Sequence, residues 1–319
     1  MRIVCLALGT LVTFAAAGLA GEPIVLKASD RWIGAVAFAP DGKSLAIGAG
    51  DGSVTIWDPA QKRKVNTLPG HHNAVAALTY STDGNLLISG GHDRVVFSRR
   101  FGRVVNPAQT RQWRDHTGAV LALAITPDNR RLFSGGIDGT IREWNIESGE
   151  SLRVLHDHTS WVNSLAVDRS GKLLASAGSD NSLRLRWMEE PSKAEVLSVK
   201  EGEIRSVAIS PDGKRVAAGI RYGWVRVWEI ESKREVFSVK AHAGETWAVA
   251  FTPDGKTLAS GGGDWNQPGE VRRWDSNTWK EKIKLSHSGE VLCISITNNG
   301  RQIAAGSWDG TVRVWELDR

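Results

Sequence analysis

The 319-residue sequence has little of what disulfide bonds, metal sites or nucleotide sites require. Its two cysteines are Cys5 and Cys293, and it has two tyrosines and two methionines. Cys293 stands in the apolar run Val-Leu-Cys-Ile-Ser-Ile, which favours a buried, unreactive thiol. The sequence lacks HExxH, CxxC and GxxxxGK[ST] motifs and any dinucleotide-binding glycine pattern. We therefore expect no metal, haem, nucleotide or other cofactor.

An excess of charge of one sign is also missing. The net charge is +5 and the pI about 9.3, which without a focused basic stripe does not indicate nucleic-acid binding. A local basic run is formed by Arg94, Arg99, Arg100 and Arg103. Its simplest interpretation is a solvent-exposed strand and loop. The alternative is a docking patch for an acidic partner, whose binding would depend steeply on salt.

The N-terminal 20 residues have the pattern of an export signal. A basic Arg2 precedes the apolar stretch 3–14, and small residues follow up to Ala20. We expect a signal peptide over residues 1–20 and a mature domain over residues 21–319, with no membrane attachment after cleavage. An uncleaved membrane anchor is the alternative, because residues 3–20 are just long enough to span. This signal and the Pro-Asp-Gly-Lys turns at 211–214 and 253–256 favour a bacterial protein that is periplasmic or secreted.

Glycine and tryptophan, in contrast, are abundant, at 34 and 14 residues. They recur within a repeat whose most complete copy runs from His116 to Trp144. In this copy Ser134 follows His116 by 18 positions and Asp138 follows Ser134 by four. Three short apolar runs, separated by a Pro-Asp turn and an Asp-Gly turn, predict three strands joined by two hairpins.

Seven copies of this repeat share one register. Three short strands have no core of their own, so the copies must bury one another. The positions equivalent to His116 are Ser29, His71, His158, Lys200, His242 and His287.

The repeat resembles the WD-repeat β-propeller family over about residues 22–317. The resemblance is carried by the Gly70-His71 and Asp115-His116 pairs, by Pro-Asp-Gly turns such as the one at Pro40, and by the Trp57-Asp58 ending. It implies an all-β, seven-bladed propeller with four antiparallel strands per blade. The sequence stops after the third strand of the seventh copy, and Leu26 lies three positions before Ser29, as Leu68 does before His71. We therefore expect residues 23–27 to supply the outer strand of the last blade and close the ring.

Some copies depart from the pattern. The Trp position holds Arg99 in the second copy, and Trp187 comes one residue late in the fourth, which predicts a bulge or a displaced ring. In the sixth copy Trp274 is ten residues after Asp264 instead of six, which predicts an extended loop over residues 265–268.

His116, Ser134 and Asp138 are the residue types of a nucleophilic triad. A catalytic set is expected once, whereas this set recurs in several copies at blade spacing. The resemblance implies that these three side chains and Trp144 hydrogen-bond one another and brace the blade. We therefore expect no catalytic residue among them.

The resemblance also implies which side chains face the opening at the top of the ring. They lie three and five residues after the position of His116, and directly before that of Asp138. The candidates for partner binding are Trp32, Trp161, Asn163, Arg205, Arg221, Trp247 and Trp308. Trp and Arg concentrate binding energy at protein interfaces. Stacked Trp rings would also suit a sugar, or would simply fill the channel.

The favoured function is a monomeric, non-enzymatic scaffold that uses this top face for a protein partner. The alternative is an exported propeller enzyme, a hydrolase or lyase, or a carbohydrate-binding protein, with its site in the central opening. Glu203, Glu245 and Glu290 are then the candidate ligands or bases. A flat rim of Trp and Arg would favour the protein-binding scaffold. A deep pocket with two glutamates near one metal would favour the enzyme.

Overall fold

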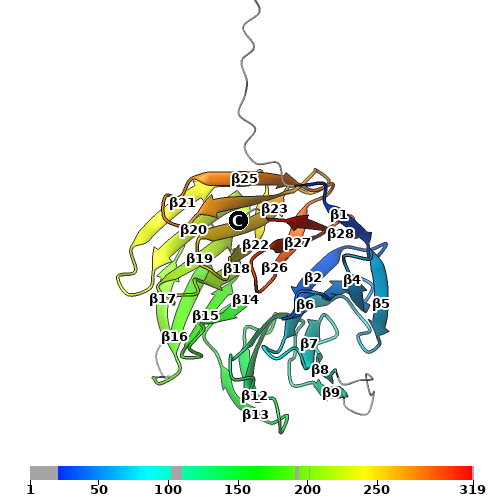
Figure 1. Ribbon diagram of the computed structural model, residues 1–319. Helices are drawn as coiled ribbons and strands as arrows, with labels where there is room; N and C mark the ends of the chain where they lie inside the picture. Colours follow the sequence, from blue (N-terminus) through cyan, green and yellow to red (C-terminus); the bar gives the residue numbers. More distant parts are fainter. Residues whose placement is uncertain (1–20, 102–109, 191–193, 201, 318–319) are drawn as a thin grey trace, which may run out of the picture.

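The computed structural model describes residues 21–101, 110–190, 194–200 and 202–317. The predicted signal or anchor at 1–20 and Arg103 of the basic run lie outside the described residues. The strands form seven four-stranded antiparallel sheets arranged in a closed ring around a central axis, as Figure 1 shows. This arrangement confirms the predicted seven-bladed propeller.

In each blade the strands run in order from the axis outward. Blade 1 contains β2 (Ile33–Phe38), β3 (Leu45–Ala49), β4 (Val54–Asp58) and β5 (Arg63–Leu68). Blade 2 contains β6 (Val75–Tyr80), β7 (Leu86–Gly91), β8 (Val96–Arg100) and β9 (Thr110–Trp113). Blade 3 contains β10 (Val120–Ile125), β11 (Arg131–Gly136), β12 (Ile141–Asn145) and β13 (Ser151–Leu155).

The remaining blades repeat this order. Blade 4 contains β14 (Val162–Val167), β15 (Leu173–Gly178), β16 (Ser182–Trp187) and β17 (Ala194–Ser198). Blade 5 contains β18 (Ile204–Ile209), β19 (Arg215–Ile220), β20 (Trp224–Glu229) and β21 (Glu235–Lys240), with a short 3-10 turn at Arg221–Gly223. Blade 6 contains β22 (Glu245–Phe251), β23 (Thr257–Gly263), β24 (Glu270–Asp275) and β25 (Glu281–Ser286). Blade 7 contains β26 (Val291–Ile296), β27 (Gln302–Ser307), β28 (Thr311–Glu316) and β1 (Ile24–Lys27).

In six of the seven blades a glycine near the end of the second strand lets neighbouring blades pack closely, and blade 4 has Ala177 at this position. A Cβ atom on Gly135 would lie 2.5 Å from Cγ1 of Val162, the first residue of the next blade's inner strand. Gly48 stands in the same relation to Val75. The first glycine of the Ser-Gly-Gly run is therefore explained by the contact between blades, and apolar side chains from adjacent sheets fill the core there.

The ring is closed by the first strand of the chain, as the sequence predicts. β1 pairs antiparallel with β28, with Ile24 opposite Val314 and Lys27 opposite Thr311. Leu26 is 1% exposed and lies in a cluster shared by blades 7 and 1. The pairing covers the edge that β28 would otherwise expose to solvent.

Two arginines occupy positions that the repeat gives to tryptophan. The expectation of a solvated strand is wrong for Arg99, which is 2% exposed and has its guanidinium 4.5 Å from the centre of the Phe97 ring. In blade 4, Arg186 is buried and Trp187 is exposed, so the ring is displaced and β16 has no bulge in either of its pairings. The exposed Trp187 does not replace the missing indole.

Candidate functional site

The four side chains proposed to brace blade 3 lie within hydrogen-bonding distance of one another. His116 contacts Asp138 through Nδ1 at 2.8 Å and Ser134 through Nε2 at 2.8 Å, and Trp144 Nε1 donates to Ser134 Oγ at 2.8 Å. An ionised carboxylate only accepts, so Nδ1 carries the proton and Nε2 accepts from the serine hydroxyl. In this arrangement Ser134 donates to the imidazole, and its oxygen accepts the indole N–H.

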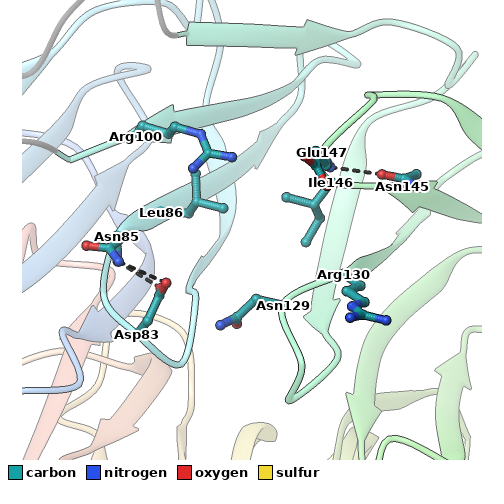
Figure 2. Close-up of a pocket in the computed structure, with 9 residues that line it drawn as sticks. All are labelled: Asp83, Asn85, Leu86, Arg100, Asn129, Arg130, Asn145, Ile146 and Glu147. Atoms are coloured by element: carbon teal, nitrogen blue, oxygen red, sulfur yellow. Dashed lines mark hydrogen bonds between the residues drawn. The ribbon is translucent and has the colours of Figure 1, made fainter.

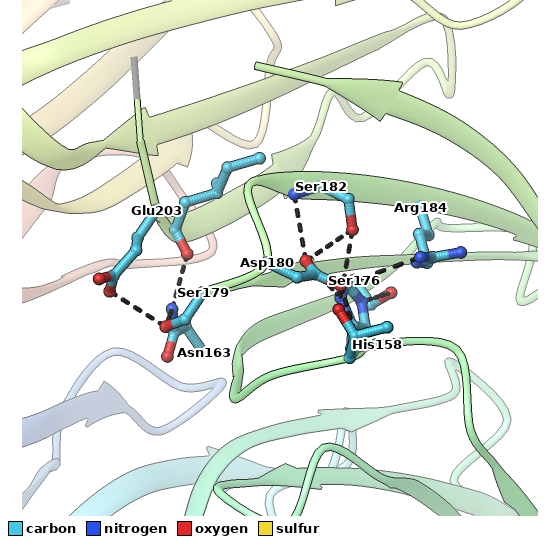
Figure 3. A network of polar contacts seen from close by, with 10 residues as sticks. His158, Asn163, Ser176, Ser179, Asp180, Ser182, Arg184 and Glu203 are labelled. Atoms are coloured by element: carbon cyan, nitrogen blue, oxygen red, sulfur yellow. Dashed lines mark hydrogen bonds and ion pairs between the residues drawn. The ribbon is translucent and has the colours of Figure 1, made fainter. Parts of the chain in front are cut away.

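The His–Asp and His–Ser contacts of this pattern are repeated in blades 2 and 4. In blade 4, His158 Nδ1 lies 3.0 Å from Asp180 Oδ1 and His158 Nε2 lies 2.8 Å from Ser176 Oγ. Figure 3 shows these side chains together. In blade 2, Arg99 Nη1 donates to Ser89 Oγ at 2.7 Å and so supplies the hydrogen bond that tryptophan gives elsewhere. Burial lowers the pKa of Arg99 to about 10, which leaves it charged at neutral pH.

In blade 6 the acidic partner comes from a different position than the register predicts. His242 Nδ1 lies 3.5 Å from Glu270, at the start of β24, while Asp264 turns into the extended loop and accepts from the Trp265 amide. The nearby His242 ring, with help from Lys284 and Arg272 and against the effect of burial, holds the pKa of Glu270 at about 2. The sequence signal was the loop itself, because four additional residues move Asp264 away from the histidine.

Blade 7 has the histidine without its serine. Ala305 stands at the serine position, and the Nε2 atom of His287 is buried with no hydrogen-bond partner among the described residues. Burial lowers the pKa of His287 to about 4, opposed in part by the charge of Asp309. Its imidazole is therefore neutral at physiological pH.

Restoring the serine gives a prediction for blade 7. Ala305→Ser is expected to raise the free energy of unfolding by about 1 kcal/mol, because the new hydroxyl satisfies His287 Nε2. Ala304→Ser is the matched control, since Ala304 is equally buried but points to the other face of the strand. It is expected to destabilise by about 1–3 kcal/mol through an unsatisfied hydroxyl. Urea unfolding measures both, and destabilisation of the Ala305→Ser variant would contradict the argument.

The top opening is a cavity of about 630 Å³ that runs into the central channel. Six of the seven candidate binding residues line it. Arg221 does not line it and instead lies at its rim, where it contacts two glutamates. The six lining candidates are Trp32, Trp161, Asn163, Arg205, Trp247 and Trp308.

One half of the opening is aromatic. The rings of Trp32 and Trp308 stack with centroids 6.0 Å apart and planes 4° from parallel, and His92 meets Trp32 edge-on at 6.1 Å. Trp308 is 43% exposed, and Trp161 across the opening is 46% exposed. Burial lowers the pKa of His92, so this half carries no charge at neutral pH.

The other half is a network of paired charges from blades 4 to 6. Arg205 contacts Glu203 at 2.6 Å and Glu245 at 3.1 Å, and Arg221 contacts the same two carboxylates at 3.1 and 3.5 Å. Ser179 extends the network, since it donates to Glu203 at 3.1 Å and accepts from Asn163 at 2.9 Å (Figure 3). Two positive and two negative charges cancel, and each side chain is held from at least two sides.

A buried glutamate joins the two halves. Glu290 is 5% exposed and accepts a hydrogen bond from Trp247 Nε1 at 2.6 Å. Burial raises the pKa of Glu290, and the nearby charge of Glu245 acts in the same direction. The guanidinium of Arg205 lies 4.8 Å from the centre of the Trp247 ring, which fixes that ring against the charged network.

A smaller hollow of about 440 Å³ lies between blades 2 and 3 on the opposite face. Figure 2 shows that the Asn85 side chain donates to the Asp83 carboxylate, and that the main-chain amide of Glu147 donates to the Asn145 side chain. Arg100 and Arg130 line the same hollow, so its charges balance. Within the described residues no three His, Cys, Asp or Glu side chains are grouped closely enough to hold a metal ion, and no helix is long and apolar enough to cross a membrane.

Seven blades in a closed ring, braced by recurring His, Ser, Asp and Trp side chains, define a repeat propeller of the WD class. The family described as WD domain, G-beta repeat, matches this sequence seven times, and the chain belongs to it. The matched residues are 23–58, 62–97, 107–145, 149–186, 194–229, 233–266 and 279–316.

Curated relatives are similar to part of this chain. B-type cell cycle switch protein ccs52A from Medicago truncatula is 34% identical over 37% of this chain and 24% of its own length. Protein groucho from Drosophila melanogaster is 31% identical over 39% of this chain and 17% of its own. Anaphase-promoting complex subunit cdh1 from Dictyostelium discoideum is 36% identical over 33% of this chain and 13% of its own. The matches therefore span less than a quarter of each relative.

These relatives correct one expectation. The prediction of a bacterial protein, periplasmic or secreted, is contradicted, because the relatives come from eukaryotes and two of them are named for the cell cycle or anaphase. The prediction relied in part on the Pro-Asp-Gly-Lys turns. Those turns are set by hairpin geometry, since proline and glycine supply the required φ values, and they carry no information about the source organism.

Proposed function

We propose that this protein is a monomeric, non-enzymatic scaffold that binds a protein partner on its top face. The observation that carries the proposal is the pair of exposed rings, Trp161 and Trp308, on a rim whose charges are already paired. Such rings bury a large apolar area at low entropic cost when a partner covers them. The contributing residues would be Trp32, Trp161, Asn163, Arg205, Arg221, Trp247 and Trp308.

The paired charges support binding to a protein surface. A lone buried charge under a partner costs several kcal/mol, whereas Arg205 and Arg221 keep their carboxylate partners when water is removed. Because the network is fixed before binding, little side-chain entropy remains to be lost on association. The rim is thus pre-organised.

The positions of the glutamates favour binding over catalysis. Glu203 and Glu245 are each held by two arginines, and Glu290 by the Trp247 indole. A general base needs a free lone pair directed at a substrate proton. The raised pKa of Glu290 is a property that general acids share, but its 5% exposure leaves it behind Trp247 rather than in the opening.

The names of the relatives agree with this proposal. One is named as a subunit of the anaphase-promoting complex, which is a protein assembly. Protein binding by this chain is our inference from that similarity and from the rim described above. The similarity does not name a partner for this chain.

Affinity capture from an extract of the source organism tests the proposal. The Trp161→Ala, Trp308→Ala double variant is expected to recover a specific partner at least about tenfold less than wild type, because truncating a central Trp costs about 2 kcal/mol or more. Trp187→Ala is the matched control, since Trp187 is 41% exposed at the far end of strand β16. Equal recovery of the same proteins by the double variant and wild type would refute the top-face proposal.

A further inference from the structure

The face opposite the top opening, which we call the lower face, carries a ring of basic side chains. In six blades a Lys or Arg directly follows the positive-φ residue of the turn between the first two strands. The seventh position, in blade 2, is an asparagine. The six basic residues are Lys43, Arg130, Lys172, Lys214, Lys256 and Arg301.

Between blades 6 and 7 this face is hollowed into a groove of about 790 Å³. We call it the blade 6–7 groove. Five basic and two acidic side chains line it. The basic residues are Arg169, Lys256, Arg273, Lys282 and Arg301, and the acidic ones are Asp254 and Glu316.

The two carboxylates in the groove are engaged with neighbouring groups. Asp254 Oδ1 accepts from the Thr252 hydroxyl at 2.6 Å and from the Lys256 amide at 3.0 Å, and so holds the turn. Glu316 accepts from the Gln302 side chain. Neither carboxylate forms an ion pair with Arg169, Lys256 or Arg301 among the described residues.

Three of the cations have no carboxylate within ion-pair distance in the part of the chain that the structure describes. They are Arg169, Lys256 and Arg301. Arg169 belongs to blade 4, and its guanidinium donates a hydrogen bond to the Pro253 carbonyl of blade 6 at 2.7 Å. That single contact positions the guanidinium at the groove and leaves its other N–H groups available, because arginine has five donors.

The rest of the lining selects among anionic ligands. Pro253, Ile283 and Leu317 give the groove apolar surface, and Asn298 and Asn299 add amide groups that suit a peptide main chain. No aromatic ring is among its described lining residues, whereas single-stranded nucleic acids bind by stacking bases on aromatic side chains. Its volume also far exceeds that of a lone phosphate.

We propose that the blade 6–7 groove binds an acidic segment of a protein partner, in which Asp or Glu side chains alternate with apolar ones. The carboxylates pair with Arg169, Lys256 and Arg301, and the apolar side chains cover Ile283 and Pro253. The site is independent of the proposed top-face site and lies on the other side of the ring. A scaffold with both sites holds two different partners at once.

Fluorescence anisotropy on the full chain tests this site with a labelled peptide of alternating leucine and aspartate. Wild type is expected to bind it about tenfold or more tightly than the matched leucine–asparagine peptide. The Lys256→Glu, Arg301→Glu variant should bind about tenfold more weakly than wild type. Raising the salt concentration should weaken peptide binding more for wild type than for this variant.

The matched control is Lys172→Glu, Arg130→Glu. It changes the same residue types at the same turn position and alters the net charge equally, but in blades 4 and 3, outside the groove. It is expected to bind almost as wild type, as is the Trp161→Ala, Trp308→Ala variant. Equal losses in both charge-reversal variants, absence of acidic-peptide binding, or tighter binding of a single-stranded RNA would each overturn the proposal.

Discussion

Deletion of residues 22–28 is expected to lower the melting temperature by about 10 °C or more. The deletion removes β1, and with it the ladder along β28 and the burial of Leu26 between blades 7 and 1. Loss of a buried leucine alone costs about 2–5 kcal/mol. The edge of β28 would then face solvent and become available for pairing with another chain.

Differential scanning calorimetry of a chain beginning at residue 21 provides the reference. Leu26→Ala isolates the apolar contribution, and Val25→Ala is its control on the same strand, since Val25 is 46% exposed and Leu26 1%. Val25→Ala is expected to change stability by no more than about 0.5 kcal/mol. An unchanged melting temperature after the deletion would show that β1 contributes nothing to closure.

Asp138→Ala is expected to destabilise the protein by about 2–4 kcal/mol. The carboxylate accepts from His116 at 2.8 Å, from the Thr117 amide at 3.0 Å, and from the Thr140 amide and hydroxyl at 3.1 and 2.8 Å. Alanine leaves these donors without an acceptor, and His116 is buried. Urea unfolding gives the free energy, and hydrogen exchange in β11 and β12 locates the loss in blade 3.

The pH dependence distinguishes this network from a packing effect. Burial acts to raise the pKa of Asp138, but the hydrogen bonds from His116 and Thr140 outweigh it and hold the pKa well below its usual range. The stability that the Asp138 carboxylate provides is therefore fully present above its pKa in the unfolded chain, about 4. It is lost as the pH falls through its lower pKa in the folded protein. The difference between wild type and Asp138→Ala should shrink below about pH 4.

Asp51→Ala is the matched control for this prediction. Asp51 occupies the same position in blade 1, but it is exposed and accepts from Ser29 at 3.0 Å instead of from a buried histidine. The loss of unfolding free energy in Asp51→Ala should be clearly smaller than in Asp138→Ala. Equal losses of stability in the two variants would mean that the contact with the buried histidine adds nothing to stability.

Most of the fold could be predicted because the repeat ties its spacing to geometry. Eighteen residues from His116 to Ser134 is the length of one inner strand, a turn and most of a second strand, so the same count in every copy gives the same blade. Ring closure followed from the position of Leu26 relative to Ser29. Most of the top-face positions could be located by the same register.

The remaining details depend on contacts that a register does not contain. Arg99 was expected in solvent because arginine side chains usually are, although the residue at its position in the repeat is buried in most of the other blades. Glu270 replaces Asp264 because a longer loop displaces the aspartate while β24 brings a second carboxylate to His242. The charge pairing of Arg221 with Glu203 and Glu245 depends on side-chain directions across two blades.

The antiparallel pairing of β1 with β28 determines how the ring responds to force. Ile24 faces Val314 and Lys27 faces Thr311, so both chain segments leave the pair on the same side. Tension applied through the two ends therefore loads the ladder one hydrogen bond at a time, beginning at Ile24, rather than shearing all of them together. Blade 7 is thus the place where pulling on the two ends would open the circle.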